Sequence, residues 1–225
     1  MIADRILYED NHLIVINKLS GEIVQSDKTG DISMIEELKS YLKEKYNKPG
    51  NVYLTAVHRI DRPVSGAVIF AKTGKAAARM GTIIKSRDFH KYYIALTCSK
   101  PNPPAGNLKN FLLKNEKQNK SYIVDSSVKN AQEAELNYQY VKSTERYHLV
   151  EIELLTGRHH QIRVQLASVG AVIKGDLKYG APRSNPDGSI SLHAHKLIFK
   201  HPVKDTEMLI IAPLPESISK LIDSY

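Results

Sequence analysis

A polar segment, residues 58–66, lies between two apolar runs and constrains the fold more than any other part of the sequence. The run before it contains Val52, Leu54 and Ala56, and the run after it covers residues 67–71. Short apolar runs bounded by polar turn residues are typical of buried strands. We therefore expect a rigid loop at the edge of a buried sheet, a common location for binding and catalytic groups.

This loop contains one carboxylate, Asp61, among three side chains that can carry positive charge, namely His58, Arg59 and Arg62. Neighbouring cations favour the ionised form of a carboxylate, which is the form that a nucleophile or a base needs. Asp61 is therefore the leading catalytic candidate. The arginines around it could hold phosphate groups.

Composition limits the class of protein. A chain of 225 residues can bury one sizeable core, so we expect a single domain over residues 1–225. Its formal charge of +8 favours a polyanionic partner such as nucleic acid, the alternative being a basic protein without such a partner. A single cysteine, Cys98, excludes an intramolecular disulfide and fits a reducing, cytoplasmic setting. We find no signal-peptide pattern and no membrane-length apolar run, and expect no membrane association.

Periodicity and turn residues predict a fold of strands and helices. The capping-box spacing of Ser33 and Glu36 predicts a helix that ends near residue 47, and Thr73 can cap a second helix. Further helices are expected at residues 158–169 and 216–222. Strands are expected at residues 6–8, 12–17, 52–56, 67–71, 91–97, 108–113, 122–125, 134–142, 147–155, 171–174, 191–199 and 208–212. The class is thus α+β, with a mixed, largely antiparallel sheet flanked by helices and loops.

A second polar cluster, Thr-Gly-Arg-His-His-Gln-Ile-Arg at residues 156–163, stands where a strand passes into a helix. In a helix that starts at Arg158, His159 and Arg163 share one face and His160 points elsewhere. Arg163 at the margin of the core needs a carboxylate partner, and Asp61 is the natural one. The alternatives are that the two form only a scaffold salt bridge, or that they never meet.

Histidines near these clusters raise the question of a metal site. No known ligand spacing appears, and the surrounding arginines would repel a divalent cation, so we expect no metal. Tyr92 and Tyr93 follow each other in a strand, so their rings point to opposite faces. One of them could stack on an extruded base in an RNA enzyme.

Four motifs in this order resemble the RluA family of RNA pseudouridine synthases over almost the whole chain. The family pattern His-Arg-Leu-Asp-Arg-x-x-Ser-Gly corresponds to residues 58–66, with Ile60 in place of Leu, and Lys-x-Tyr-x-Ala corresponds to residues 91–95. The Thr-Gly-Arg-x-His-Gln-Ile-Arg motif is residues 156–163, and Gly-Asp-x-x-Tyr-Gly is residues 175–180.

The resemblance implies that Asp61 is the catalytic aspartate, Arg163 its ion-pair partner and Tyr93 the ring against the target uracil. It also implies a central RNA-binding cleft, no cofactor and no metal. The remaining expected substrate contacts are Arg59, Arg62, Arg158, His160 and Gln161. We expect a monomer that acts on ribosomal or transfer RNA and lacks the N-terminal RNA-binding module of many relatives.

Three positions depart from the family motifs. His159 replaces the usual Ser or Thr, Gln165 the usual His, and Ala171-Val172 the usual His-Pro. We expect these positions to lie beside the cleft and to affect the choice of substrate. Two other functions remain open, a non-catalytic RNA-binding or RNA-folding protein and a metal-dependent RNA hydrolase.

Overall fold

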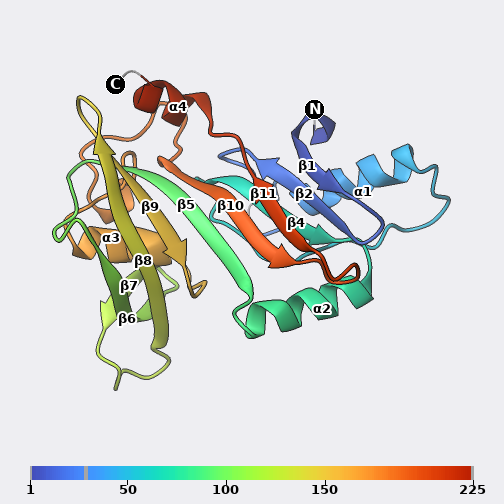
Figure 1. The fold of residues 1–225 in the computed structure, drawn as a ribbon, viewed down its shortest axis with the longest axis horizontal. Coiled ribbons are helices and arrows are strands. Elements are labelled where there is room, and N and C mark those ends of the chain that lie inside the picture. Colours follow the sequence, from blue (N-terminus) through green and yellow to red (C-terminus); the bar gives the residue numbers. More distant parts are fainter. Residues whose placement is uncertain (1, 28–29, 224–225) are drawn as a thin grey trace. The chain divides into compact units, whose positions relative to one another are not determined.

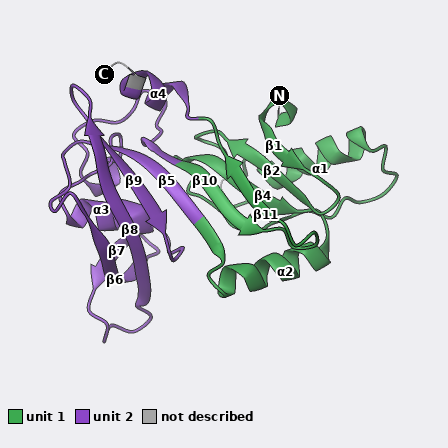
Figure 2. Ribbon diagram, in the orientation of Figure 1, with its two compact units in different colours: residues 1–90, 194–213 green, residues 91–193, 214–225 purple. Residues whose placement is uncertain are grey.

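The computed structural model describes residues 2–27 and 30–223, which form two compact units (Figures 1 and 2). Unit 1 comprises the chain up to residue 90 together with residues 194–213, and unit 2 comprises residues 91–193 and the chain from residue 214. Strands β5 (Phe89–Thr97) and β10 (Leu192–Lys200) contribute residues to both units. The expected α+β class is confirmed, whereas the single domain over residues 1–225 and the central cleft stay predictions.

Unit 1 is built on a sheet in the order β1-β2-β4-β10, with β3 paired to β4 and β11 to β10. The strands are β1 (Ile6–Glu9), β2 (Leu13–Lys18), β3 (Thr55–Ala56), β4 (Ser65–Ala71) and β11 (Glu207–Ile211), after a 3-10 turn η1 (Ile2–Arg5). The strands predicted at residues 6–8 and 12–17 are confirmed as β1 and β2, which pair antiparallel. The strand predicted at residues 52–56 is only two residues long, and Val52 and Leu54 are buried without belonging to a strand.

Both predicted helices of unit 1 are present with their predicted caps. Helix α1 (Met34–Lys45) starts after Ser33, which forms the full capping box with Glu36. Helix α2 (Gly74–Lys85) starts after Thr73, whose hydroxyl accepts a hydrogen bond from the Ala76 N–H. Each cap satisfies amide groups that the first turn of a helix leaves without a partner.

These two helices cover opposite faces of the unit 1 sheet. Ile14 and Ile16 of β2 belong to the buried cluster that contains α1, whereas Leu13 and Val15 belong to the cluster that contains α2. Strand β4 alternates in the same way and all seven of its residues are buried. Burial on both faces explains why the sequence of β4 is apolar throughout instead of alternating with polar residues.

Unit 2 contains an antiparallel sheet in the order β5-β9-β8-β6-β7. The strands besides β5 are β6 (Ala105–Asn115), β7 (Lys120–Val124), β8 (Gln132–Ser143) and β9 (His148–Leu154). Helix α3 (Gln161–Ser168) packs against β6 and β8 through Val164, and helix α4 (Glu216–Asp223) packs against β5 and β9 through Ile218. A short 3-10 helix, η2 (Leu177–Tyr179), contacts α3.

Two predictions for unit 2 are wrong. Residues 171–174 form no strand, and only Ile173 makes an isolated bridge, to Thr97. Helix α3 starts at Gln161 and not at Arg158, because His160 has a left-handed backbone with φ of 52°. His159 therefore precedes the helix and does not share a helical face with Arg163.

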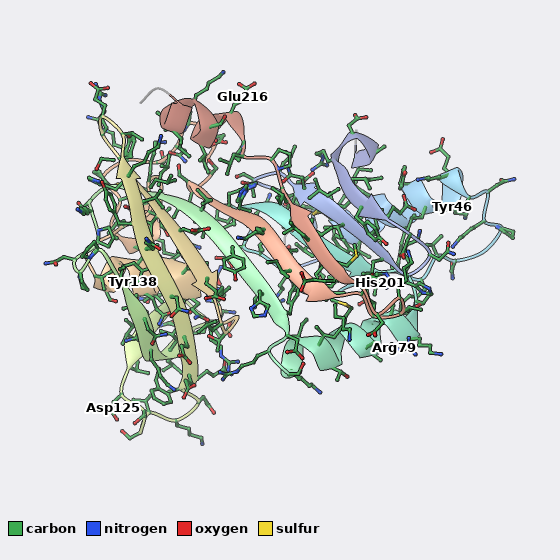
Figure 3. The ribbon with its side chains drawn as sticks, viewed as in Figure 1. Tyr46, Arg79, Asp125, Tyr138, His201 and Glu216 are labelled. Carbon is green, nitrogen blue, oxygen red and sulfur yellow. The ribbon has the colours of Figure 1, made fainter. Side chains whose placement is uncertain are left out.

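Residue His201, labelled in Figure 3, shows how unit 1 uses a buried histidine as a structural anchor. Its Nδ1 accepts hydrogen bonds from the N–H groups of Val203 and Lys204, so the proton lies on Nε2, 3.0 Å from the Asp10 carboxylate. Burial lowers the pKa of this imidazole, against the opposing effect of Asp10.

In the part of the chain that the structure describes, no helix is long and apolar enough to cross a membrane.

Candidate functional site

The turn that carries Asp61 lies in unit 1 immediately before β4. Asp61 is half-buried, and its carbonyl accepts a hydrogen bond of 3.0 Å from the Val64 N–H. The carbonyls of the next three residues are all hydrogen-bonded to residues 18–21, which lie at and just after the end of β2. Arg62 O accepts from the Gly21 N–H at 2.8 Å and Pro63 O from the Ser20 hydroxyl at 3.3 Å.

Lys18, the last residue of β2, anchors this turn through its side chain and has no exposed surface. Its Nζ lies 3.1 Å from Arg62 O, 2.7 Å from Val64 O and 2.9 Å from its neighbour Leu19 O. An ammonium group has three N–H donors, so the three carbonyls match it completely. Burial lowers the pKa of Lys18 to about 8, opposed by the negative charges of Glu22 and Asp61, so Lys18 is charged at neutral pH.

Sequence reasoning missed this role of Lys18. The available signal was a lysine at the end of a strand that begins with four apolar residues, Leu13 to Ile16. Its two acceptors in the turn are 44 and 46 residues away in the sequence, and no local pattern identifies them. The rigid loop that we expected around Asp61 therefore depends on a tertiary contact.

The other charged residues of this loop differ in their roles. His58 Nε2 accepts a hydrogen bond of 3.2 Å from the Ile69 N–H, and its ring packs edge-on against Phe89. Arg62 is exposed and pairs with Asp31 at 2.7 Å, and Arg59 is exposed. His58 thus supports β4, whereas the two arginines lie on the surface, where a phosphate could reach them.

Arg163 is held in unit 2 by a buried carboxylate that sequence reasoning did not assign. Its Nε and Nη2 lie 2.7 and 2.8 Å from the two Asp176 carboxylate oxygens, and both side chains are almost fully buried. This fork uses Nε and one terminal nitrogen, so it is compatible with a second carboxylate at the other terminal nitrogen. The pairing of Arg163 with Asp61 stays a prediction.

Tyr179 connects Arg163 with the buried His160. Its ring lies 5.2 Å from the Arg163 guanidinium, and its hydroxyl lies 3.0 Å from His160 Nδ1. The hydroxyl also accepts from the Ser121 N–H and donates to the Ser121 carbonyl. Burial, followed by the charge of Arg163, lowers the pKa of His160 to about 2, so this imidazole is neutral at physiological pH.

Gln161 organises the turn before α3. Its Oε1 accepts from the Thr156 hydroxyl and the Arg158 N–H, and its Nε2 donates to Glu135 O at 3.0 Å. Because Gln161 is buried and bonded at both ends of its amide, it positions its neighbours. Arg158 is exposed, with Nε bonded to Glu133 O at 2.8 Å.

Tyr93 lies on β5 opposite Ile152 and is 5% exposed. Strand alternation places it on the face away from Ile94 and Leu96, which pack toward α4. Lys91, two residues earlier on the same face, has its pKa lowered by burial to about 8.

The departures from the motif pattern differ in their burial. Gln165 is fully buried and donates to Leu108 O and Asn110 Oδ1, and Ala171 is also fully buried. His159 and Val172 are partly exposed. The expected effect on substrate choice therefore concentrates on His159 and Val172.

The structure brings the predicted residues together in two groups. Arg59, Asp61 and Arg62 share one turn in unit 1, and the residues around α3 share one hydrogen-bonded cluster in unit 2. Within residues 2–27 and 30–223, no group of three or more His, Cys, Asp or Glu side chains is arranged to hold a metal ion.

Sequence comparison identifies a family for these motifs. The family model described as RNA pseudouridylate synthase matches residues 12–168. A ribosomal large subunit pseudouridine synthase C of Vibrio vulnificus is 32% identical, over 99% of this chain and 70% of the relative. The uncharacterized RNA pseudouridine synthase YhcT of Bacillus subtilis is also 32% identical, over 98% of this chain and 72% of the relative.

Solved structures agree with this comparison. Human RNA pseudouridylate synthase domain containing 4 superposes with a TM-score of 0.82 and 26% identity, over 99% of this chain and 93% of that chain. Human RNA pseudouridylate synthase domain containing 1 has a TM-score of 0.71 at 22% identity, over 96% and 86% of the two chains, and supports the fold.

Proposed function

Because the chain belongs to the RNA pseudouridylate synthase family, we propose that it isomerises uridine to pseudouridine in structured RNA with Asp61 as the catalytic aspartate. The observation that carries this proposal is the Asp61 turn, in which the carbonyls of the three following residues are hydrogen-bonded to residues 18–21. A reactive carboxylate needs such a rigid support to keep its geometry.

The reaction breaks the bond between uracil N1 and ribose C1′, turns the uracil, and joins its C5 to the same C1′. The C5 proton leaves and N1 gains a proton, so nothing is oxidised or hydrolysed. Asp61 can add to the sugar, add to the uracil ring, or assist removal of a sugar proton, and each route requires an ionised carboxylate.

The other predicted residues take supporting roles in this proposal. Arg163, oriented by Asp176, pairs with Asp61 and keeps it ionised. Tyr93 packs against the target uracil, which must leave its stack to react. Arg59, Arg62 and Arg158 hold RNA phosphates, the buried His160 and Gln161 support the substrate contacts by positioning their neighbours, and no cofactor or metal takes part.

The substrate in this proposal is ribosomal or transfer RNA. The Vibrio relative is a ribosomal large subunit pseudouridine synthase, so large-subunit ribosomal RNA is the first substrate to test. An unpaired uridine in a loop or bulge is favoured, because extruding it costs only a few kcal/mol. We expect a cytoplasmic enzyme that works as a monomer.

The test uses total RNA from a strain that lacks this gene, incubated with purified protein and mapped for pseudouridine. We expect new pseudouridine with the wild type and a loss of about a thousandfold or more in rate with Asp61→Asn. RNA affinity should stay within about threefold, since the substitution removes no phosphate contact. The matched control is Asp88→Asn. Asp88 is an exposed carboxylate of unit 1 that accepts a hydrogen bond from the Ser86 hydroxyl.

Three results would contradict the proposal. Unchanged uridine in all RNA would favour a non-catalytic RNA-binding or RNA-folding protein. Pseudouridine formation by Asp61→Asn at the wild-type rate would exclude Asp61 as the catalytic aspartate. Strand cleavage that a chelator stops would favour a metal-dependent hydrolase.

A further inference from the structure

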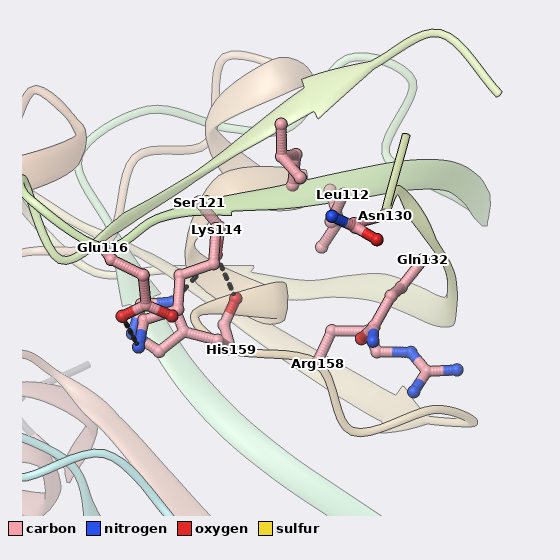
Figure 4. A pocket seen from close by; sticks show the side chains of 9 residues that line it. Leu112, Lys114, Glu116, Ser121, Asn130, Gln132, Arg158 and His159 are labelled. Carbon is pink, nitrogen blue, oxygen red and sulfur yellow. Dashed lines mark hydrogen bonds and ion pairs between the residues drawn. The ribbon is translucent and has the colours of Figure 1, made fainter. Parts of the chain in front are cut away.

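Unit 2 contains a pocket of about 380 Å³ that the residues proposed for catalysis do not line (Figure 4). Ligand sites in proteins have volumes of about 300–1,000 Å³, so the pocket is large enough for one small ligand. Leu112 and Leu113 of β6 contribute its apolar surface, and Asn130 and Gln132 contribute exposed amide groups.

The charge of the pocket is mixed but includes two accessible cations. Lys114 is exposed and pairs with Glu116 at 2.6 Å, and Arg158 is exposed beside it. Arg158 donates to the Glu133 carbonyl through Nε, and its two terminal nitrogens take no part in that hydrogen bond. Cations beside amide and apolar groups match a nucleotide, which has one phosphate, a polar base edge and an apolar base face.

His159 provides a rigid aromatic wall for this pocket. Its ring stacks on His160 with a centroid distance of 3.8 Å and an interplanar angle of 19°. Its Nδ1 lies 2.8 Å from the Ser121 hydroxyl and its Nε2 lies 3.0 Å from Asn119 Oδ1. Because both nitrogens are bonded, the His159 ring is held in one orientation where it lines the pocket.

The support behind His159 is also rigid. His160 is buried, bonded to Tyr179, and neutral at physiological pH, so the stacked pair carries little charge repulsion between its rings. Single-stranded RNA bases stack on aromatic side chains of this kind, histidine included. The Ser or Thr typical of the family motif would offer no ring at this position.

We propose that this pocket binds one unpaired, unmodified nucleotide of the substrate RNA, with its base on His159, its base edge at Asn130 and Gln132, and its phosphate near Lys114 and Arg158. The pocket then acts as a specificity subsite that selects which uridine is modified. This inference depends on the proposed pseudouridine synthase function.

The test compares changes in the protein with changes in the RNA. A short RNA that contains the mapped uridine is made with a single abasic nucleotide at each unpaired position in turn. With the wild type, we expect one position at which the missing base raises KM about tenfold, the lower part of the range for one base stack, with kcat unchanged.

In His159→Thr and in Gln132→Ala, the intact RNA should show the raised KM, and the abasic change at that position should have almost no further effect. Gln132 is exposed, so its substitution keeps the test valid where His159→Thr perturbs folding. The control is Gln139→Ala, an exposed glutamine on the same strand β8 that does not line this pocket.

The possible results lead to three different conclusions. Failure of the wild type to form pseudouridine in any RNA would overturn the proposed function. If pseudouridine forms, but the KM increases caused by the protein variant and by the abasic nucleotide multiply at every position, the two act independently and the subsite alone would be overturned. Pocket variants with the wild-type KM would overturn it too. Coupling at one position, absent in Gln139→Ala, would support it.

Discussion

At the scale of single residues, two buried cations support the site through different kinds of partner. Lys18 bonds to neutral carbonyls of the backbone, and Arg163 bonds to the carboxylate of Asp176. A buried charge without such partners would be strongly destabilising. The two cations therefore order the backbone near Asp61 and the surroundings of α3, respectively, and neither needs to touch a substrate to matter.

Substitution of Lys18 tests the anchoring of the Asp61 turn. Lys18→Met keeps the apolar stem but leaves three carbonyls without the ammonium, so we expect the free energy of unfolding to fall by about 2–4 kcal/mol. At a temperature where the variant stays folded, kcat should fall while RNA affinity changes little. Urea unfolding and single-turnover kinetics measure the two effects.

Lys39→Met serves as the control, because Lys39 is exposed on α1 and its loss should leave both quantities near the wild-type values. Equal stability of Lys18→Met and Lys39→Met would contradict an anchoring role. A stable Lys18→Met variant with the wild-type kcat would show that the Lys18 hydrogen bonds do not affect the chemical step.

At the scale of elements, the close approach of β4 and β10 determines how the Asp61 turn enters the sheet. Gly66 in β4 has a φ of +121°, and a Cβ there would lie 2.3 Å from the Ala194 carbonyl oxygen of β10. Gly66 is also the partner of Lys18 in the ladder between β2 and β4. Only glycine permits this backbone conformation together with this contact.

Two glycine substitutions of opposite sign test this point. Gly66→Ala should lower the free energy of unfolding by more than about 2 kcal/mol, because the new methyl group meets backbone atoms that cannot move aside. Gly81→Ala in α2 should raise it by about 0.5–1 kcal/mol, because alanine is the better helix former and its Cβ would meet no atom within 4 Å.

Denaturant titrations of both variants measure the difference, and circular dichroism at the start of each titration checks that the helices are present. A Gly66→Ala variant as stable as the wild type would show that β4 and β10 can separate at this point. In that case the support of the Asp61 turn would depend on its hydrogen bonds to Lys18, Ser20 and Gly21.

At the scale of the whole molecule, the positive charge is the property that most affects binding. The formal charge of +8 favours association with a polyanion before any specific contact forms. Binding to RNA phosphates releases counterions, so affinity falls as the salt concentration rises. The proposed phosphate contacts at Arg59, Arg62 and Arg158 give this effect a measurable size.

A salt series with the inactive Asp61→Asn protein tests these contacts. With these three phosphate contacts, a plot of log affinity against log salt concentration should have a slope of about −2, or a loss of about twentyfold between about 50 and 200 mM. Arg158→Gln should reduce the magnitude of the slope by about 0.7, the contribution of one contact to a single strand. Lys85→Gln, an exposed charge at the end of α2, should leave the slope unchanged.

The sequence by itself determined the elements whose signals are local. The capping residues Ser33 and Thr73 define the starts of α1 and α2, and the apolar run of β4 indicates burial on both faces. The four motifs were sufficient to identify the family, because they need only residue types and order. The sequence also made Asp61 the catalytic candidate, since it is the one carboxylate in a basic loop, and this role stays a prediction.

Tertiary structure alone decided which charged groups meet and where α3 begins. The sequence favoured Asp61 as the partner of Arg163, and no local pattern identified Asp176 as the carboxylate that binds it or the turn carbonyls as the acceptors of Lys18. The left-handed backbone of His160 moved the start of α3 past His159, which placed that ring against the pocket. The physical reason is that helix caps and apolar periodicity act over a few residues, whereas buried charges are satisfied by whichever distant groups the folded chain brings within hydrogen-bond distance.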